Sequence, residues 1–320
     1  MTETLTGLTT ERVGPESAAD VLAIVQAAFS QRPPMDPPAD ALSETVESIA
    51  AKLSALGGLI ARRDGQPVGT LILDPVDQTV FIRRFAVMPG EQGHGIARAM
   101  VDRVAAAAGD RFRDLAVIAR EELPRNILFW ERQGFREIAR TSPYVEMRRP
   151  LHTHVATVST PEAMQHLGSR LGAVLAAGDL LVLSGELGAG KTTFTQGLAE
   201  GLDVRGPITS PTFVIARIHP PLGSGPELVH VDAYRLGSIA ELDDLDLDTD
   251  LEDAVTVVEW GAGLAEGLAE SRLEIALTRA LAADALVDAR EGEDPRRVEI
   301  TPIGPRWHDV DWATITAVID

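Results

Sequence analysis

The hydrophobic positions of this chain change spacing repeatedly, from the intervals of amphipathic helices to the continuous or alternating runs of strands. In the first half, helical spacing predicts helices over residues 17–30 and 40–56, a third that ends near Ala108, and a fourth over residues 125–133. Apolar runs bounded by turn residues predict strands at residues 58–62, 68–73, 80–88, 115–118, 135–139 and 144–147. Alternation of this kind predicts an α/β fold.

The pattern breaks once, near the middle of the chain. Strand character ends at residues 148–149, Pro150 interrupts regular structure, and alternation resumes at residues 154–158. A chain of 320 residues is long for one domain and comfortable for two. We therefore expect one domain over residues 1–150 and a second over residues 151–320, each a sheet with flanking helices.

The second half is expected to begin with a helix and continue as strands. Ser159 and Glu162 fit a capping box with a proline in the first turn, which predicts that a helix begins there. Its buried stripe is expected to be Met164, Leu167, Leu171, Val174 and Leu175. Further strands are expected at residues 181–183, 228–232, 255–259, 272–277 and 297–300, helix or loop at 278–289, and a terminal helix at 311–319.

The most informative stretch is a glycine-rich loop that precedes a helix-forming segment at residues 193–202. Gly185, Gly190, Lys191 and Thr192 fit the phosphate-binding pattern G-x-x-x-x-G-K-[ST]. Glycines let backbone N–H groups at a helix N-terminus turn toward a phosphate chain. The lysine supplies a charge for the outer phosphates, and the hydroxyl is placed to bind a magnesium ion. The plainer alternative is a turn that only connects a strand to a helix.

Composition sharpens this picture. Lysine and arginine together number 29, yet Lys52 and Lys191 are the only lysines, so the loop position favours a compact ammonium over a planar guanidinium. The net charge of −19 argues against broad nucleic-acid binding, which needs a basic face. The absence of cysteine excludes disulfides, thiol nucleophiles and thiolate metal sites. With no signal-like or membrane-length apolar run, we expect a soluble, cytoplasmic protein that does not contact the membrane.

Two apolar runs downstream of the loop end in acids. Residues 228–232 end at Asp232, and residues 255–259 end at Glu259. Because parallel strands carry their carboxyl ends to one edge of a sheet, both carboxylates are expected near the metal and phosphates of a nucleotide hydrolase. Either acid alone could be an ordinary strand-end residue, but two of them downstream of a complete phosphate loop favour function.

A family resemblance rests on four motifs in register, at residues 187–194, 210–213, 230–236 and 258–260. From residue 155 to about 300 the chain resembles TsaE, the small ATPase of bacterial synthesis of tRNA threonylcarbamoyladenosine (t6A). The resemblance implies a P-loop NTPase-like sheet with flanking helices that hydrolyses ATP with Mg2+. It also implies t6A transferase subunits (TsaD- and TsaB-like proteins) as partners, with tRNA contacted only indirectly.

The resemblance assigns roles to particular side chains. Lys191, Asp232 and Glu259 would be catalytic, and Thr192 and Glu259 would be the magnesium ligands. The ATP-binding set would be Gly185, Glu186, Leu187, Gly188, Ala189, Gly190, Lys191, Thr192, Thr193 and Trp260. The plainer alternative for Trp260 is a core residue.

Neighbouring segments would support this site. Residues 209–213 would sense the γ-phosphate, Tyr234 and Arg235 would brace the site or contact a partner, and residues near Thr160 would reach the base. The acidic run at residues 241–250 is either a solvated segment, a docking surface for a basic partner, or a segment ordered by magnesium.

Rival nucleotide-binding classes lack their signatures here. A guanine-specific N-K-x-D box needs a lysine after Lys191, and none follows; no transporter signature is present either. A small-molecule kinase would usually carry an arginine-rich lid, whereas the segment after Asp232 is acidic. This difference disfavours a small-molecule kinase, which is kept only as the alternative function for this half of the chain.

A second, weaker phosphate loop lies in the first half. Gln92, Gly95 and Ala97 fit the pattern Q/R-x-x-G-x-G/A that follows the central strand of GNAT-family N-acetyltransferases, and the element order of residues 1–150 is similar to theirs. The resemblance implies a mixed sheet with flanking helices, transfer from acetyl-CoA to an unknown amine, and a pyrophosphate site at a helix N-terminus. The implied acetyl-CoA set is Val87, Gln92, Gly93, His94, Gly95, Ile96 and Ala97.

The first half departs from the GNAT pattern at the position of the general acid. Trp130 stands where the family usually has a tyrosine, and an indole N–H cannot protonate a thiolate. Leu123 replaces a frequent asparagine, with Asn126 offset from it. Either another group supplies the proton, with Tyr144, one of only two tyrosines, as a candidate, or this unit senses acyl-CoA or docks a partner without catalysis. The general base is unassigned; the candidates by position are Glu91, Glu121 and Glu122.

Overall fold

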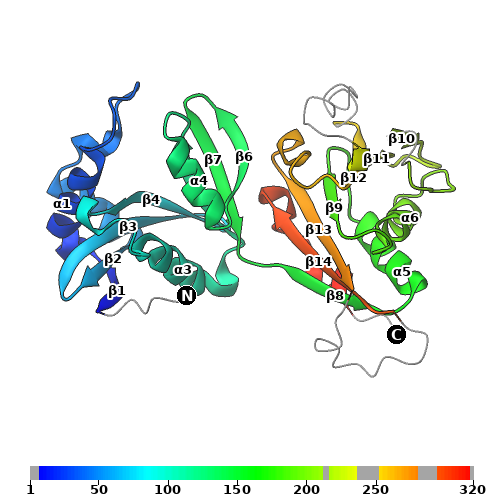
Figure 1. Ribbon diagram of the computed structural model, residues 1–320, viewed down its shortest axis with the longest axis horizontal. Helices are drawn as coiled ribbons and strands as arrows, with labels where there is room; N and C mark the ends of the chain where they lie inside the picture. Colours follow the sequence, from blue (N-terminus) through cyan, green and yellow to red (C-terminus); the bar gives the residue numbers. More distant parts are fainter. Residues whose placement is uncertain (1–6, 212–215, 236–251, 280–293, 318–320) are drawn as a thin grey trace. The chain divides into compact units, whose positions relative to one another are not determined.

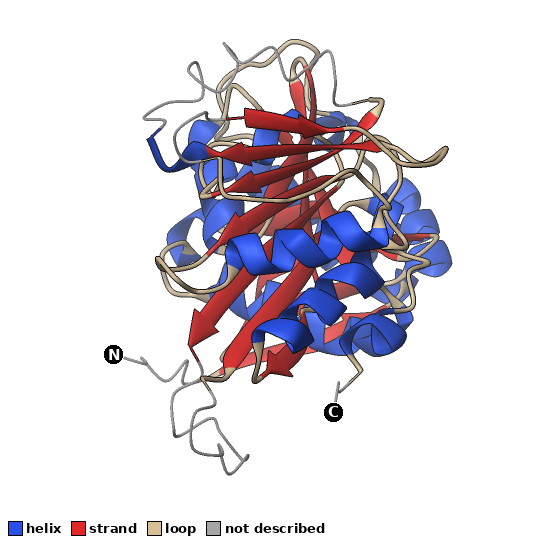
Figure 2. Ribbon diagram, turned by 90° about the vertical axis from the view of Figure 1, so that its right-hand side faces the viewer, coloured by secondary structure: helices blue, strands red, loops and turns tan. Residues whose placement is uncertain are grey.

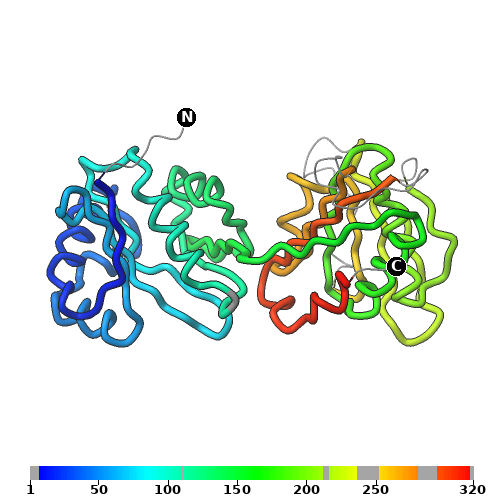
Figure 3. The backbone as a smooth tube through the Cα atoms, turned by 90° about the horizontal axis from the view of Figure 1, so that it is seen from below, coloured from blue at the N-terminus to red at the C-terminus, as the bar shows by residue number. Residues whose placement is uncertain are grey.

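The computed structural model describes residues 7–211, 216–235, 252–279 and 294–317. The chain divides into two compact units, Met1–Leu151 and His152–Asp320, connected by one passage of the backbone (Figure 3). Each unit contains a seven-stranded mixed sheet with helices packed on it (Figure 1), so the predicted α/β class is confirmed. No helix among the described residues is both long and apolar enough to cross a bilayer.

The first unit is a sheet with strand order β1-β2-β3-β4-β5-β7-β6, in which only β4 and β5 pair in parallel. Its strands are β1 (Leu8–Val13), β2 (Gly58–Arg63), β3 (Gln66–Val76), β4 (Thr79–Val87), β5 (Asp114–Arg120), β6 (Arg136–Thr141) and β7 (Tyr144–Pro150). Its helices are α1 (Ala18–Phe29), α2 (Val46–Leu56), α3 (Ile96–Ala108) and α4 (Pro124–Arg132). Neighbouring β2 residues point to opposite cores: Ile60 packs with α1 and α2, and Leu59 with α3.

The helix predicted over residues 40–56 is wrong in its first part. A 3₁₀ helix (Asp40–Ser43) comes first, and α2 begins only at Val46. Thr45 is extended, and its side chain accepts a hydrogen bond from the Ser48 backbone N–H while Ser48 Oγ accepts one from the Thr45 N–H. This reciprocal cap places the helix start after the apolar pattern has already begun. Strand β1 was not predicted, because its sequence is mostly polar.

The parallel strands β4 and β5 diverge and leave a gap in the sheet of the first unit. The two strands pair only from Thr79 to Phe81 and from Asp114 to Ala116, and beyond these residues they separate. The register of β4 against β3 also shifts near Arg84, whose φ of 50° is left-handed. A bulge of this kind bends a strand and redirects its side chains. The gap between the separated strand ends is where this unit has its cavity.

The second unit has strand order β10-β11-β12-β9-β13-β14-β8. The strands are β8 (His154–Val158), β9 (Leu180–Ser184), β10 (Ala216–His219), β11 (Glu227–Asp232), β12 (Ala254–Glu259), β13 (Arg272–Arg279) and β14 (Arg296–Ile303). β11, β12, β9 and β13 form a parallel centre. In its register, Glu259 lies opposite Asp232 on one side and Leu183 on the other, so the strand-end acids and the end of β9 share one edge.

Helices α5 (Pro161–Gly172), α6 (Lys191–Gly201) and α8 (Trp312–Thr316) cover one face of this sheet, and Figure 2 shows helices lying across the strands. The predicted cap is wrong by one residue: Thr160, not Ser159, caps α5, with its hydroxyl accepting from Ala163 N–H. Val174 is wrong as a stripe residue; it follows the end of α5 and is 40% exposed. The predicted terminal helix is shorter than expected, and residues 280–289 of the 278–289 prediction lie outside the described part.

Glycines allow helices α5 and α6 to pack closely against each other. Gly168 and Gly172 on α5 face Gly197 and Gly201 on α6, and a Cβ at Gly197 would overlap the carbonyl oxygen of Gln165. The two backbones therefore touch where side chains would normally separate them. The contact lies along the middle and end of α6, the helix that begins at Lys191.

Gly197→Ala is expected to lower the free energy of unfolding of the second unit by about 1–3 kcal/mol, the usual range for overpacking. Alanine is the better helix former, so the intrinsic propensity alone predicts the opposite sign. Urea unfolding of the full chain measures the change. Gly267→Ala is the matched control, because a Cβ there meets nothing within 4 Å; equal stability of the two variants would contradict the close-packing account.

Candidate functional site

The phosphate loop of the second unit lies between β9 and α6. Gly185, Gly188 and Gly190 have φ values of 145°, 77° and 105°, which disfavour other residues. A Cβ at Gly185 would also overlap the carbonyl oxygen of Leu277. No side chain caps α6, so the N–H groups at its start remain available to an anion. The loop therefore has the form of a phosphate cradle.

Lys191 is the cation of this loop and is only 5% exposed. Its Nζ donates hydrogen bonds to the carbonyl oxygens of Gly185 (2.9 Å) and Glu186 (3.1 Å) and lies 3.8 Å from the ring centroid of Trp260. Burial lowers the pKa of Lys191, and the charges of Glu259 and Asp232 oppose that shift. The ammonium is thus held at the mouth of the cradle by backbone oxygens and an aromatic face.

Two buried carboxylates lie beside the start of α6. Thr192 Oγ1 donates to Glu259 Oε1 at 3.0 Å, and Glu259 is 2% exposed. Asp232, 4% exposed, accepts a hydrogen bond from Ser210 Oγ at 3.0 Å and another from the backbone N–H of Tyr234 at 3.1 Å. The hydroxyl and the Glu259 carboxylate offer oxygen ligands only, the donor type that Mg2+ prefers.

His230 is a further member of this cluster. Its side chain is fully buried, and its Nε2 lies 3.0 Å from Glu259 Oε1, the oxygen that also receives the Thr192 hydroxyl. Because an ionised carboxylate only accepts hydrogen bonds, His230 Nε2 carries the proton. His230 and Asp232 are two residues apart on β11 and share a face of the sheet. The histidine therefore fixes one oxygen of Glu259.

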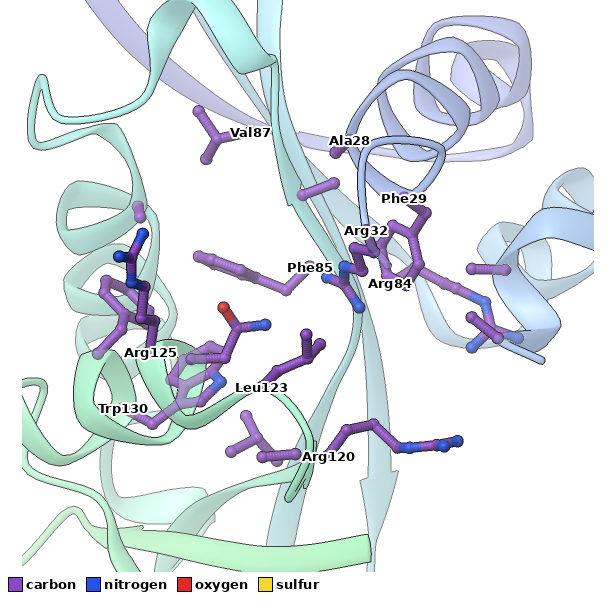
Figure 4. Close-up of a pocket in the computed structure, with 18 of the residues that line it drawn as sticks. Ala28, Phe29, Arg32, Arg84, Phe85, Val87, Arg120, Leu123, Arg125 and Trp130 are labelled. Atoms are coloured by element: carbon purple, nitrogen blue, oxygen red, sulfur yellow. The ribbon is translucent and has the colours of Figure 1, made fainter. Parts of the chain in front are cut away.

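The first unit contains a cavity of about 1130 Å³ between the separated ends of β4 and β5 (Figure 4). One side of it is the loop before α3, where Gly93 and Gly95 have φ values of 83° and 75°. No side chain caps α3, and Gln92 Nε2 donates to the Val87 carbonyl oxygen at 3.4 Å. The open space around Gly93, where a Cβ would meet nothing within 4 Å, suits a pyrophosphate held by backbone N–H groups.

Trp130 lies on α4 and is 7% exposed. Its ring packs against Phe85, Phe129 and Phe135, with centroid distances of 4.9, 5.0 and 4.9 Å. Tyr144 lines the same cavity and is 42% exposed. The tryptophan thus completes an aromatic wall, and the phenol is the one hydroxylic ring that the described residues bring to this cavity.

The three candidate bases differ in their surroundings. A hydrogen bond from Arg120 lowers the pKa of Glu122 to about 2, so Glu122 is a poor proton acceptor near neutral pH. Glu91 pairs with Arg63, and Glu121 accepts a hydrogen bond from Ser142 Oγ. No base is assigned by this geometry.

Comparison with known proteins separates the two units. Residues 158–285 match the family described as threonylcarbamoyl adenosine biosynthesis protein TsaE, and residues 21–135 match the acetyltransferase (GNAT) family. A protein of Streptomyces coelicolor named tRNA threonylcarbamoyladenosine biosynthesis protein TsaE is 57% identical over 149 residues, covering 46% of this chain and 96% of that protein. The chain belongs to the TsaE family.

Other known proteins match one unit each. A Bacillus subtilis protein of the same name is 38% identical over 148 residues, covering 46% of this chain and 84% of that protein. A crystal structure of YdiB from Bacillus subtilis aligns at 32% identity and a TM-score of 0.37, over 49% of this chain and 89% of that one. An N-acetyltransferase from Thermoplasma acidophilum, solved with coenzyme A, aligns at 10% identity and a TM-score of 0.41, over 45% and 98%. We call the second unit, which carries the TsaE match, the TsaE unit, and the first unit, which carries the match to the GNAT family model, the GNAT unit; both predicted resemblances are confirmed.

Within the TsaE unit, the structure brings Lys191, Thr192, Asp232, Glu259 and Trp260 together, as the sequence predicts. Of the remaining loop residues, Glu186, Leu187 and Gly188 are exposed and Ala189 is buried, while Thr193 lies in the first turn of α6. Tyr234 is 64% exposed, and its ring centroid lies 5.2 Å from that of Trp260. Residues 212–213 of the predicted γ-phosphate sensor and the acidic run 241–250 lie outside the described residues. The individual assignments stay predictions.

The residues present fit the groups that the two families imply. In the TsaE unit, the glycine cradle, the loop ammonium and the Thr192–Glu259 oxygen pair suit ATP with Mg2+; among the described residues no cluster of three or more acids or histidines could hold a metal, so phosphate and water would complete its shell. In the GNAT unit, the uncapped start of α3 suits the pyrophosphate of acetyl-CoA. His94 is exposed there, and Ile96 is buried.

Arg84, which lines the cavity of the GNAT unit, pairs with the buried carboxylate of Glu44. Burial raises the pKa of Glu44, but hydrogen bonds from Lys52, Ser48 and Arg84 lower it by more. The net effect is to lower the pKa of Glu44 from 4.5 to about 2. Because the folded pKa lies below the unfolded value, this stabilisation is complete above pH 4.5 and is lost as the pH falls through about 2.

Glu44→Gln is therefore expected to destabilise the GNAT unit by roughly 2–3 kcal/mol near neutral pH, with the difference from wild type vanishing toward about pH 2. Urea unfolding at a series of pH values measures this, with pulse-labelled hydrogen exchange of α2 peptides as the unit-specific probe. A difference that stayed constant across the acid range would contradict the assigned pKa shift.

Proposed function

We propose that the TsaE unit is a Mg-ATP-dependent ATPase that supports t6A modification of tRNA. The observation that carries the proposal is the convergence of a complete phosphate loop with Thr192 and Glu259, which are in hydrogen-bond contact across the sheet edge. Bound magnesium would neutralise charge on the outer phosphates. Lys191 would pair with those phosphates, Thr192 and Glu259 would hold the metal, and Asp232 would orient the attacking water.

The surroundings explain why Asp232 suits that role. Both of its oxygens are already engaged, one by Ser210 Oγ and the other by the Tyr234 N–H, so its position is fixed before nucleotide enters. Pre-positioned groups stabilise developing charge without reorganising during reaction. Trp260, against the Lys191 ammonium, would cover the nucleotide side of the loop.

The proposed partners are the TsaD- and TsaB-like subunits of the t6A transferase, in the cytoplasm. The net charge of −19 fits this arrangement, because an acidic ATPase would leave tRNA binding to its partners. We propose residues 151–320 as the ATPase domain and residues 1–150 as a separate acyl-CoA domain.

Phosphate release tests the ATPase proposal. With Mg-ATP, we expect slow release by the full chain alone and faster release when TsaD- and TsaB-like subunits are added. Phosphoryl transfer to small acceptors, with no stimulation by those subunits, would instead establish a small-molecule kinase.

For the GNAT unit we propose acetyl transfer from acetyl-CoA to an amine. The carrying observation is the cavity between the separated strands, bordered on one side by the loop at Gln92–Ala97. A non-catalytic acyl-CoA sensor is the second candidate, favoured by Trp130 at the usual tyrosine position. Calorimetry with acetyl-CoA, together with thiol release in the presence of amine-bearing peptides, separates the two: binding without release would establish the sensor.

A further inference from the structure

The cavity of the GNAT unit has a second side, away from the loop that precedes α3. It is built from the end of α1 and the proline-rich segment that follows, with Ala28, Phe29, Arg32, Met35 and Ala39 among its lining residues. In Figure 4, Phe29 and Arg32 lie on the side of the cavity opposite Arg125 and Trp130. Because the pyrophosphate loop occupies one side, this other side is where a second substrate would enter.

Most of the charged residues on this side of the cavity are arginines, although the net charge of the chain is −19. Two of them already have acidic partners. Arg84 Nη2 lies 2.7 Å from Glu44 Oε1, and Arg120 Nη2 lies 2.6 Å from Glu122 Oε1 while its fork also donates to carbonyl oxygens of the proline-rich segment. These two arginines therefore bring little uncompensated charge to the cavity.

Arg32 differs from both. Its guanidinium carbon lies 3.5 Å from the ring centroid of Phe29, and no ion pair joins it to a carboxylate among the described residues. Its side chain is half-buried, and burial alone lowers the pKa of Arg32 to about 10. A desolvated guanidinium without an acidic partner is costly, and an anion in the cavity would offset that cost.

We propose that Arg32 binds the carboxylate of the amine that accepts the acetyl group; this inference rests on the acetyl transfer proposed above. The planar fork of a guanidinium matches a carboxylate with two parallel hydrogen bonds. Stacking on Phe29 restricts the plane of that fork, so the direction of the bound carboxylate is restricted as well. One uncompensated guanidinium suits a single negative charge better than a phosphate, which carries nearly two.

The carboxylate contact would place the amine toward the thioester. In the transfer, the amine nitrogen attacks the thioester carbonyl, a C–N bond forms and the C–S bond breaks. The amine loses one proton, and the departing CoA sulfur gains one. The substrate class is therefore a primary amine that carries a free carboxylate, such as an amino acid.

Matched pairs of ligands test this on the full chain. The probes are common L-amino acids, each compared with its own amide, and phosphoethanolamine for the phosphate alternative. Their affinity for protein saturated with CoA is measured by calorimetry, and their turnover by thiol release from acetyl-CoA. At least one acid is expected to bind about 10- to 100-fold more tightly than its amide and more tightly than phosphoethanolamine.

Variants assign the effect to one side chain. Arg32→Gln is expected to remove the preference for acid over amide while leaving the affinity for acetyl-CoA unchanged, and Arg32→Lys to restore part of it. Arg111→Gln is the matched control, because Arg111 also stacks on a phenylalanine (5.5 Å from the Phe112 centroid) but does not line the cavity.

The possible outcomes distinguish a failure of this inference from a failure of the acetyl transfer proposed for the GNAT unit. Acid preference that disappears in Arg32→Gln supports the inference, even if no amine is acetylated, in which case the proposed transfer alone fails. Turnover of acids and amides with equal efficiency, a preference that survives Arg32→Gln, tighter binding of phosphoethanolamine, or no binding of any amino acid would each overturn it.

Discussion

Lys191→Ala is expected to weaken ATP binding by at least about 100-fold and to abolish phosphate release. The ammonium is buried within the loop, and it is held by carbonyl oxygens that fix its position without neutralising its charge. Phosphate oxygens would form charge-assisted hydrogen bonds with it, each roughly twice as strong as a neutral one. Alanine would leave the phosphates facing two buried acids, Asp232 and Glu259, without a compensating cation. Calorimetry with ATP in the presence of Mg2+ measures the affinity.

Two further variants sharpen this experiment. Lys52→Ala removes the other lysine of the chain, on α2 of the GNAT unit, and is expected to leave ATP affinity unchanged. Lys191→Arg keeps the charge but replaces a compact ammonium with a wide fork, in a site where the Trp260 ring is 3.8 Å from Nζ. We expect Lys191→Arg to lose most of the affinity as well. ATP binding by Lys191→Ala at the wild-type level would remove the loop from the proposed site.

Local spacing explains what could be predicted from the sequence. The phosphate loop is a contiguous pattern whose glycines have positive φ values in the structure, so its form follows from its sequence. Asp232 and Glu259 lie far apart in sequence, yet both end apolar runs, and parallel pairing brings such ends to one edge. The positions of the two acids at one edge of the sheet could therefore be predicted from the sequence, because both residues end strands.

Other features depend on details that periodicity does not encode. Thr160 and Ser159 are adjacent hydroxyl residues and either could cap α5; the backbone geometry selects Thr160. Helical spacing continues to Val174, although α5 ends at Gly172. His230 interrupts an apolar strand, which was a signal of buried polar chemistry, but its partner Glu259 is on another strand. Arg32 lines a cavity that lies where β4 and β5 separate, and helical or strand spacing does not encode that separation.

Glu259→Gln is expected to reduce Mg-dependent ATP hydrolysis by about 100- to 1,000-fold, the effect typical of losing one group that stabilises charge in the transition state. The substitution keeps the shape of the side chain and one carbonyl oxygen for the Thr192 hydroxyl, so folding should be preserved. It removes the negative charge that Mg2+ requires. ATP affinity without magnesium should stay close to that of wild type, and the increase in affinity on adding magnesium should be lost. Glu252→Gln, at an exposed position just before β12, is the control.

His230→Gln gives a graded test of the same cluster. His230 does not reach the nucleotide loop itself but donates to Glu259 Oε1, so it would act by positioning the carboxylate. Loss of such an outer partner typically lowers metal affinity or activity by about 10- to 100-fold. The magnesium concentration required for half-maximal hydrolysis should therefore rise in His230→Gln, while ATP affinity without magnesium is unchanged. In the double variant with Glu259→Gln, the histidine substitution should add little, because it acts through the charge already removed. Additive losses would show that His230 serves the site by a route other than Glu259.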